Sequence, residues 1–309
     1  MEGDAKATGS IRVAESDADL QLFARIRLAA SPREWPVPPR REPDRLMLLW
    51  RDVGCGLAAR SDLADSVTVQ IYVDPAARRA GIGRALWDRL TVHARTFGRP
   101  FVFCTVDEQS ADGVAFAARR GLAEVAREVE ARRRISHEAP PAALPGIEVV
   151  TIAERPELLE AAWHAVGADG CADIPLPSPL SMTVEDWIEE EATVPDGSFV
   201  AIEDGRIVGY AGMLKDEHGL TTVARSHRGR GIATHLKLRQ LAWASAAGVP
   251  ELVSYTQGVN HGMRRVNEKL GYRIQPAWLK MQGPLPAIQP AMRSRRASRS
   301  SSESPPSHR

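Results

Sequence analysis

The stretch Arg225-Ser226-His227-Arg228-Gly229-Arg230-Gly231-Ile232-Ala233-Thr234 lies between a strand-like run, 220–224, and a helix-like run that ends at Ala246. A glycine-rich turn at the start of a helix leaves backbone N–H groups free and directed at one place, which creates a binding site for an anion such as phosphate. Glycine also lets a ligand approach the backbone closely. We therefore predict a phosphate-binding loop here.

A second loop of the same kind occurs upstream, in Val73-Asp74-Pro75-Ala76-Ala77-Arg78-Arg79-Ala80-Gly81-Ile82-Gly83-Arg84. Arg78 lies 150 residues before Arg228, and Gly121 lies 150 residues before Gly271. A repeat with this period indicates two homologous domains rather than a solenoid. The length agrees, because 309 residues correspond to two domains of about 150 residues each.

The composition is that of an ordinary globular protein, with 43% hydrophobic and 26% charged residues. A net charge of +1 gives no electrostatic argument for nucleic-acid binding. No apolar run reaches the ~18 residues of a membrane span, and the acidic start is unlike a signal peptide. Cys55, Cys104 and Cys171 are widely spaced and fit a reducing compartment better than a metal site. We predict a cytoplasmic protein without a metal.

Hydrophobic periodicity and turn residues predict a similar order of elements in each half. The first half is expected to have strands at 11–15, 45–51, 54–59, 66–73, 101–106 and 122–135, and helices after residue 16, at 83–96 and at 111–120. The second half is expected to have strands at 146–152, 198–203, 206–214, 220–224, 251–256 and 272–281, and helices at 155–166, 184–191, 234–246 and 260–270.

These elements divide the chain into domains 1–137 and 146–287, a proline-rich linker at 138–145 and a disordered Ser/Arg-rich tail at 288–309. Proline-rich segments also break the regular pattern at 31–43 and at 170–179, where we expect the variable walls of a cleft. We interpret the acidic run at 185–191 as a solvated helix face, with attraction of a cationic amine to the neighbouring acceptor cleft as the alternative.

Two other classes of phosphate-binding loop do not fit. The loop of nucleoside triphosphatases needs Lys-Ser/Thr after its last glycine, whereas Gly81 and Gly231 are followed by Ile82 and Ile232. A dinucleotide fingerprint needs three glycines near the start of the domain and an acidic residue about 20 residues later. Neither copy has that spacing, and both lie in the middle of their domains.

The remaining pattern, Arg-x-x-Gly-x-Gly/Ala after a strand that ends in valine, resembles the GCN5-related N-acetyltransferase (GNAT) family in a tandem, two-domain form. A second marker is the series Asn260, Met263 and Asn267 before 270–272, which corresponds to Ser110, Gly113 and Ala117 in the first half. The resemblance covers most of residues 11–284. It implies an α/β (α+β) fold in which each domain has a mixed, mostly antiparallel, splayed central sheet flanked by helices.

The resemblance implies acetyl-coenzyme A as the cofactor, with its pyrophosphate at the helix start and its pantetheine arm between the splayed strands. It implies direct attack by an amine in a ternary complex and requires no metal. The implied cofactor-binding residues are Val73, Arg78, Arg79, Ala80, Gly81, Ile82, Gly83 and Arg84 in the first half, and Val223, Arg228, Gly229, Arg230, Gly231, Ile232, Ala233, Thr234 and Asn260 in the second.

Many members of that family protonate the leaving thiolate with a tyrosine four residues before the glycine of a Gly-Phe pair. This position is Ala117 in the first half and Asn267 in the second. We expect the second half to be catalytic and the first to be degenerate, structural or cofactor-binding. The candidate catalytic residues are Asn267, Glu217 and Tyr272, with Tyr210, Asp216, His218 and Tyr255 as open alternatives.

The sequence thus predicts an acetyl-coenzyme A-dependent N-acetyltransferase that acts on the primary amine of a small molecule. Two alternatives stay open. The missing tyrosine suggests a non-catalytic acetyl-coenzyme A sensor or scaffold, and the basic tail suggests a protein N-acetyltransferase. No membrane partner is expected, nucleic acid is not favoured, and both a monomer and a homodimer are compatible with the sequence.

Overall fold

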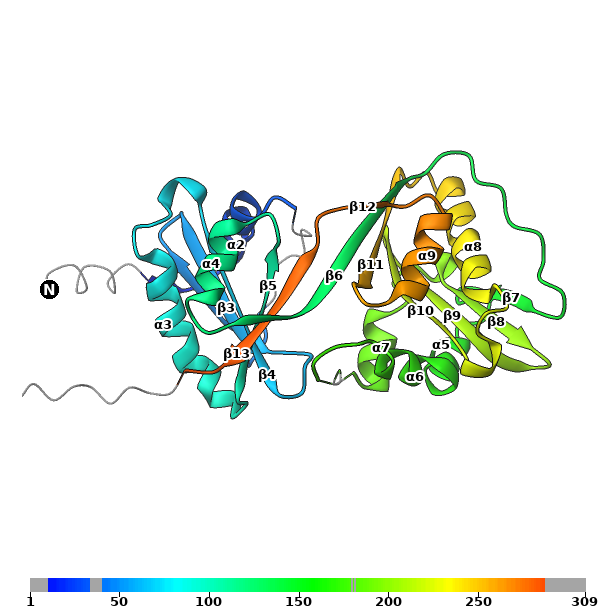
Figure 1. Cartoon of the computed structure of the whole chain (residues 1–309), viewed down its shortest axis with the longest axis horizontal. Coiled ribbons are helices and arrows are strands. Elements are labelled where there is room, and N and C mark those ends of the chain that lie inside the picture. Colours follow the sequence, from blue (N-terminus) through cyan, green and yellow to red (C-terminus); the bar gives the residue numbers. More distant parts are fainter. Residues whose placement is uncertain (1–10, 34–40, 179, 181, 287–309) are drawn as a thin grey trace, which may run out of the picture.

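The computed structural model of the chain describes residues 11–33, 41–178, 180 and 182–286. Two α/β halves lie side by side and share one hydrogen-bonded sheet of 13 strands (Figure 1). The predicted tail at 288–309 lies outside the described residues. Helices and strands of the first half are β1 (Ile11–Val13), α2 (Asp17–Ala30), β2 (Leu46–Trp50), β3 (Gly54–Arg60), β4 (Ser66–Val73), α3 (Ile82–Ala94), β5 (Phe101–Asp107), α4 (Ala111–Ala118) and β6 (Ala123–Arg134).

The second half repeats this order with more helical residues ahead of its hairpin. Its elements are β7 (Glu148–Thr151), α5 (Leu158–Ala162), α6 (Ala168–Ala172), α7 (Val184–Glu190), β8 (Phe199–Glu203), β9 (Arg206–Leu214), β10 (Glu217–Val223), α8 (Ile232–Ala246), β11 (Glu251–Gln257), α9 (His261–Lys269), β12 (Arg273–Ile274) and β13 (Trp278–Pro284).

One helix extends further than the sequence predicted. A π-helical turn at Trp163–Gly167 joins α5 to α6, so helical backbone continues to Ala172. The prediction of an irregular segment at 170–179 was therefore wrong for residues 170–172, whereas residues 173–178 belong to no helix or strand. Gly170 allows α6 to lie close to β10, because a Cβ atom there would lie 2.6 Å from Oγ1 of Thr222.

The sheet is mixed and mostly antiparallel, as predicted. Two parallel pairs interrupt it, and both are short. Strand β4 pairs with β5 only through residues 66–68, and β10 pairs with β11 only where Glu217 lies beside Val253. Beyond these points the two strands of each pair separate toward the glycine loops, which gives each half the splay that the resemblance implied.

The last strand of the chain belongs to the sheet of the first half. All seven residues of β13 pair with β5, and β13 also pairs with the beginning of β6. The end of β6 crosses to the second half, where residues 128–134 pair with β11 (Figure 1). Neither half therefore completes its sheet with its own residues, while the predicted domain boundaries stay a prediction.

The single strand predicted at 272–281 was wrong. Its residues form two strands: β12 pairs with β6 beside the second half, and β13 lies in the first half. The connection contains Pro276, which has no backbone N–H and cannot continue a ladder of hydrogen bonds. The chain can leave one sheet edge there and enter another.

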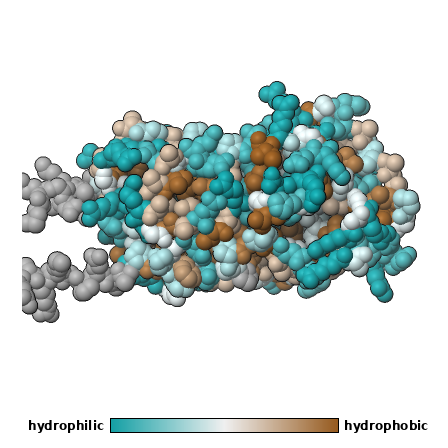
Figure 2. Space-filling view, in the orientation of Figure 1, coloured by the Kyte–Doolittle hydropathy of each residue, from teal (hydrophilic) through white to brown (hydrophobic). Residues whose placement is uncertain are grey.

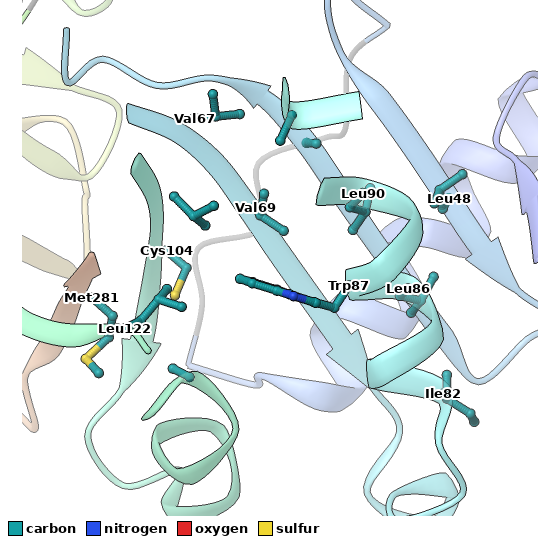
Figure 3. Packing of buried hydrophobic residues seen from close by; sticks show 14 of the residues in the cluster. Leu48, Val67, Val69, Ile82, Leu86, Trp87, Leu90, Cys104, Leu122 and Met281 are labelled. Carbon is teal, nitrogen blue, oxygen red and sulfur yellow. The ribbon is translucent and has the colours of Figure 1, made fainter. Parts of the chain in front are cut away.

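Each half packs helices onto its sheet around an apolar core. In the first half, Leu86, Trp87 and Leu90 of α3 face the strands, and β13 adds Met281 (Figure 3). Leu279 of β13 belongs to the same core. The surface is mainly polar, with apolar side chains gathered near the middle, where the halves meet (Figure 2). Within the described part of the chain, no helix has the length and hydropathy needed to cross a bilayer.

Candidate active site

The two glycine loops have nearly the same backbone. Gly81 and Gly231 precede α3 and α8 with left-handed φ values of 82° and 84°, and no side chain caps either helix. A Cβ atom added to either glycine would have no neighbour within 4 Å. Each loop therefore presents a helix N-terminus to open space, which is the arrangement that binds phosphate groups.

All five predicted arginines have partners within the protein, and the partner of Arg84 is Asp88. Nε of Arg78 and of Arg228 donates to the carbonyl oxygen of the preceding strand end, at 3.2 Å from Val73 and 3.0 Å from Val223. These two guanidinium groups thus hold each loop against its strand. Arg230 forms two hydrogen bonds with Glu203, and Arg79 pairs with Asp112. Cofactor contacts by these arginines stay a prediction.

Asn260 has a local structural role. Its side chain caps α9 by accepting a hydrogen bond from the backbone N–H of Met263 at 3.1 Å. Ser110 caps α4 in the same way through the N–H of Gly113. The second sequence marker is therefore a helix-capping signal in both halves, and its contact with the cofactor stays a prediction.

The first loop opens onto a cavity of about 540 Å³. This is within the size range of small-molecule sites, about 300–1,000 Å³. Its walls are the separated parts of β4 and β5 together with α4 and Trp278. Burial raises the pKa of Cys104, which lines it, to about 12, so this thiol is not a nucleophile at neutral pH. Of the eight predicted first-half residues all but Ala80 line the cavity, namely Val73, Arg78, Arg79, Gly81, Ile82, Gly83 and Arg84.

The corresponding region of the second half has a different chemistry. Residues 150 positions apart can be compared directly except at the start of β10, where a bulge shifts the register by one and Glu217 corresponds to Thr68. Apolar side chains and a cysteine of the first half (Figure 3) are replaced by ionisable or hydrogen-bonding ones in the second. The pairs are Trp87 and Lys237, Leu90 and Gln240, Cys104 and Ser254, Ala117 and Asn267, and Leu122 and Tyr272.

Lys237 and Asn267 meet at one hydroxyl group. Nζ of Lys237 lies 3.3 Å from Oγ of Ser254, and Nδ2 of Asn267 lies 3.1 Å from the same oxygen. Asn267 also donates to Thr256, while its Oδ1 atom is buried without a hydrogen-bond partner. Burial lowers the pKa of Lys237 to about 7.

Tyr272 belongs to a neighbouring hydrogen-bonded chain. Its hydroxyl bonds to Nε2 of His218, whose Nδ1 lies 2.7 Å from Oε1 of Gln240. Nε2 of Gln240 donates in turn to the carbonyl oxygen of Gly212 at 2.7 Å. Burial lowers the pKa of His218 well below its usual value, which keeps the ring neutral, and raises the pKa of Tyr272. Tyr272 thus has a buried hydrogen-bonding partner, His218, and its catalytic role stays a prediction.

Glu217 lies where β10 and β11 begin to separate. Burial raises the pKa of its carboxyl group to about 7, and the nearby negative charge of Glu128 adds to this effect. His218, the next residue, faces Gln240 of α8. Successive side chains of a strand point to opposite faces, so Glu217 points to the face opposite α8.

Glu191 was interpreted from the sequence as part of a solvated helix face, and this interpretation was wrong. Its side chain turns inward, where Oε1 accepts the N–H of Leu220 at 3.2 Å. Burial raises its pKa to about 7. Gly212 and Gly219 leave room for the carboxylate, because a Cβ atom on either would collide with it. Lys237 was missed, although aligning the two copies would have shown a lysine opposite Trp87.

Comparison with known proteins agrees with this arrangement. Residues 21–122 and 167–272 each match the family described as "Acetyltransferase (GNAT) family". A mycothiol acetyltransferase of Catenulispora acidiphila is 29% identical over 243 residues, which cover 72% of this chain and 74% of the relative. A mycothiol acetyltransferase of Thermomonospora curvata is 30% identical over 227 residues, or 70% of this chain and 74% of the relative.

Solved structures share the fold of the whole chain. A GCN5-related N-acetyltransferase from Sphaerobacter thermophilus superposes with a TM-score of 0.69 at 19% identity and covers 90% of this chain and 97% of its own. A tandem GNAT protein from the clavulanic acid biosynthesis pathway gives a TM-score of 0.68 at 21% identity and covers 90% of this chain and 100% of its own. At these identities the likeness concerns the fold alone.

Proposed function

We propose that this chain, which belongs to the acetyltransferase (GNAT) family, acetylates the primary amine of a small molecule and does so in its second half. The chain is an acetyl-coenzyme A-dependent acetyltransferase. The observation that carries the assignment to the second half is Glu217, a partly buried carboxyl group at the opening between β10 and β11 with a pKa of about 7. The first half has Thr68 at this position, because β10 contains a bulge that β4 lacks.

The residues of both loops fit a coenzyme A pyrophosphate. The N–H groups that follow Gly81 and Gly231 are uncapped, and the space above both glycines is open. In the second half the unpartnered Oδ1 of Asn267 offers an acceptor for a donor group of the pantetheine arm. When bound, acetyl-coenzyme A supplies the activated acetyl thioester.

Glu217 would take the proton from the attacking amine. A general base works best when its pKa lies near the working pH, and burial brings Glu217 to about 7. Because it points away from α8, it meets an acceptor that enters from the face of the sheet opposite the helix. Glu191 and Asp216, which lie near it, would favour a cationic amine over a neutral or anionic acceptor.

The first half would bind the cofactor without turning it over. Its cavity has the required size and position, but Thr68 and Ala117 stand where the second half has Glu217 and Asn267. A threonine hydroxyl is not a base at neutral pH, and an alanine side chain neither donates nor accepts a proton. The relatives named mycothiol acetyltransferases make amines related to mycothiol the first acceptors to test.

A matched pair of variants tests the assignment. Gly231→Trp and Gly81→Trp introduce the same side chain at the same backbone conformation, so the local strain is similar. Calorimetry counts bound coenzyme A, and thiol release with an amine panel reports turnover. We expect two binding equivalents in the unmodified protein, one in each variant, and loss of turnover only with Gly231→Trp.

The opposite result would transfer the chemistry to the first half. Loss of turnover with Gly81→Trp alone would overturn the proposal. Binding of two equivalents without thiol release from any amine would support the sensor or scaffold alternative, for which the buried Ala117 and Asn267 are the structural argument.

A further inference from the structure

Lys237 is a buried cation without a counter-ion. It lies in the second turn of α8 with 1% of its surface exposed. Among the residues that the structure describes, no carboxylate forms an ion pair with it. The titratable groups that face it are His218 of β10 and Tyr272 before β12, and burial favours the neutral form of both. Burying an unpaired amine costs free energy, and Trp87 shows that the fold accepts an apolar side chain here.

The partners of Lys237 mark the place where the family resemblance puts its acid. Asn267 occupies that position, and it shares Oγ of Ser254 with Lys237 at 3.1 and 3.3 Å respectively. In the first half the three corresponding residues, Trp87, Cys104 and Ala117, all line the 540 Å³ cavity. Lys237 therefore stands at the wall of the equivalent site in the second half.

Lys237 and Glu217 approach that site from opposite faces of the sheet. Ser254, the partner of Lys237, alternates along β11 with Tyr255, which pairs with Glu130. Glu130 is among the carboxylates that raise the pKa of Glu217. Glu217 thus lies on the side of the sheet from which we expect the amine. Lys237 lies on the side of α8, whose N-terminus follows the glycine loop.

We propose that Lys237 donates the proton that the coenzyme A thiolate receives in the second half, and that Ser254 and Asn267 position its ammonium group. This rests on the function proposed above. The amine nitrogen forms a bond to the acetyl carbon while the carbon–sulfur bond breaks, leaving its electron pair on sulfur. Lys237 gives a proton to sulfur and becomes neutral, and Glu217 takes the proton that the nitrogen loses. Exchange with water restores both groups.

Burial suits Lys237 to this task. A lysine at its usual pKa of 10.5 holds its proton too firmly to be an efficient acid at neutral pH, and the lower value of about 7 removes that disadvantage. The same ammonium group attracts a thiolate, because an opposite charge within a few ångströms favours the ionised form of its neighbour.

The first test uses coenzyme A alone as the probe. In Gly81→Trp protein, where only the second loop is open, the thiolate absorbance of bound coenzyme A is titrated against pH. We expect Lys237→Met to raise the pKa of the bound thiol by about 1–3 units, since a nearby cation shifts an acid by that much. Lys269→Met, which removes an exposed lysine of α9, is the control and should leave it unchanged.

The second test needs no substitution at Lys237. The chain has five lysines, so spectra of protein labelled with ¹⁵N-lysine are simple. We expect the pKa of Lys237 to rise by about 1 unit or more when coenzyme A is bound at high pH as its thiolate. This measurement decides the matter if Lys237→Met fails to fold.

Two results would overturn the inference separately from the proposed function. If coenzyme A binds and its thiol titrates alike with and without Lys237, the lysine is not the donor while the second half keeps its cofactor. The same holds if bound coenzyme A leaves the pKa of Lys237 unchanged. If Gly81→Trp protein binds no coenzyme A, the assignment of the reaction to the second half fails, and the role of Lys237 fails with it.

Discussion

The first half of the molecule has the cavity and the second half has the ionisable groups. At equivalent positions around the strand splay, the first half packs Leu90, Trp87 and Leu122 (Figure 3), whereas the second buries Gln240, Lys237 and Tyr272. The apolar version shows that the fold does not need these polar groups. Because burying them costs free energy unless they are well paired, their presence in one copy only supports the proposal that the second half carries the chemistry.

The largest expected effect comes from Glu217→Gln. Removing a general base costs about 10²–10⁴ in rate, so we expect kcat/KM to fall by that factor with little change in coenzyme A binding. Above pH 7 the proposed acid, Lys237, loses its proton, so the rate should fall there. Below a pKa of about 7 the base of the unmodified enzyme is protonated, so its rate should rise as the pH increases toward 7. This rise should vanish in the variant.

Asp216→Asn is the control for that experiment, because this neighbouring residue was an alternative candidate for the base. An equal loss of rate in both variants, or a loss in Asp216→Asn alone, would contradict the role of Glu217. Thiol release measured over a pH series, with coenzyme A binding followed by calorimetry, distinguishes these results.

The buried Lys237 should lower the free energy of unfolding at neutral pH. In the unfolded state the amine of Lys237 is protonated below its usual pKa of 10.5. In the folded state it is protonated only below a pKa of about 7. Stability should therefore decrease as the pH falls from 10.5 to 7, by at most about 5 kcal/mol. Lys237→Met should raise the free energy of unfolding at pH 7 and lose most of this advantage near pH 10.5.

Urea unfolding at both pH values measures this difference, with Lys269→Met as the control. The exposed Lys269 should give a change of at most about 0.5 kcal/mol. An unchanged or lowered stability of Lys237→Met at pH 7 would mean that the second half has adapted to its polar core, and the contrast with Trp87 would lose its energetic basis.

A third prediction concerns β13, the last strand of the chain, which lies in the sheet of the first half. Leu279 of β13 is 5% exposed and packs into the core of the first half. Replacing a buried leucine with alanine costs about 2–5 kcal/mol, so Leu279→Ala should destabilise the first half although the residue comes from the end of the chain. Hydrogen exchange should show faster opening of β4 and β5 than of β8 and β9.

Ile274→Ala is the matched control, because Ile274 lies in the short strand before β13 and is 50% exposed. We expect at most about 0.5 kcal/mol there. Faster exchange confined to β8 and β9 in Leu279→Ala would show that β13 supports the second half instead.

The sequence predicted what depends on local pattern. The loop glycines, the repeat of 150 residues and most strands and helices follow from periodicity and turn residues, and these led to the family. The exchange of β13 could not be predicted, since pairing partners are long-range and the run 272–281 reads as one strand. Glu191 was misinterpreted because helical spacing alone does not show which carboxylate turns inward. Lys237 can be recognised as a candidate only when the two copies of the repeat are aligned, because local periodicity does not compare distant positions.

The smallest expected effect concerns Asn260 and Ser110, and it distinguishes helix capping from cofactor binding. Asn260 and Ser110 cap α9 and α4 in the same manner, and replacing a capping side chain with alanine costs about 1 kcal/mol. Asn260→Ala and Ser110→Ala should therefore destabilise the protein about equally in thermal unfolding. If Asn260 also holds the cofactor, as the family resemblance implies, its variant should weaken coenzyme A binding to the second loop beyond the effect of Ser110→Ala on the first. Equal affinities in calorimetry would restrict Asn260 to capping, and the difference between the halves would then rest on Glu217, Lys237 and Asn267.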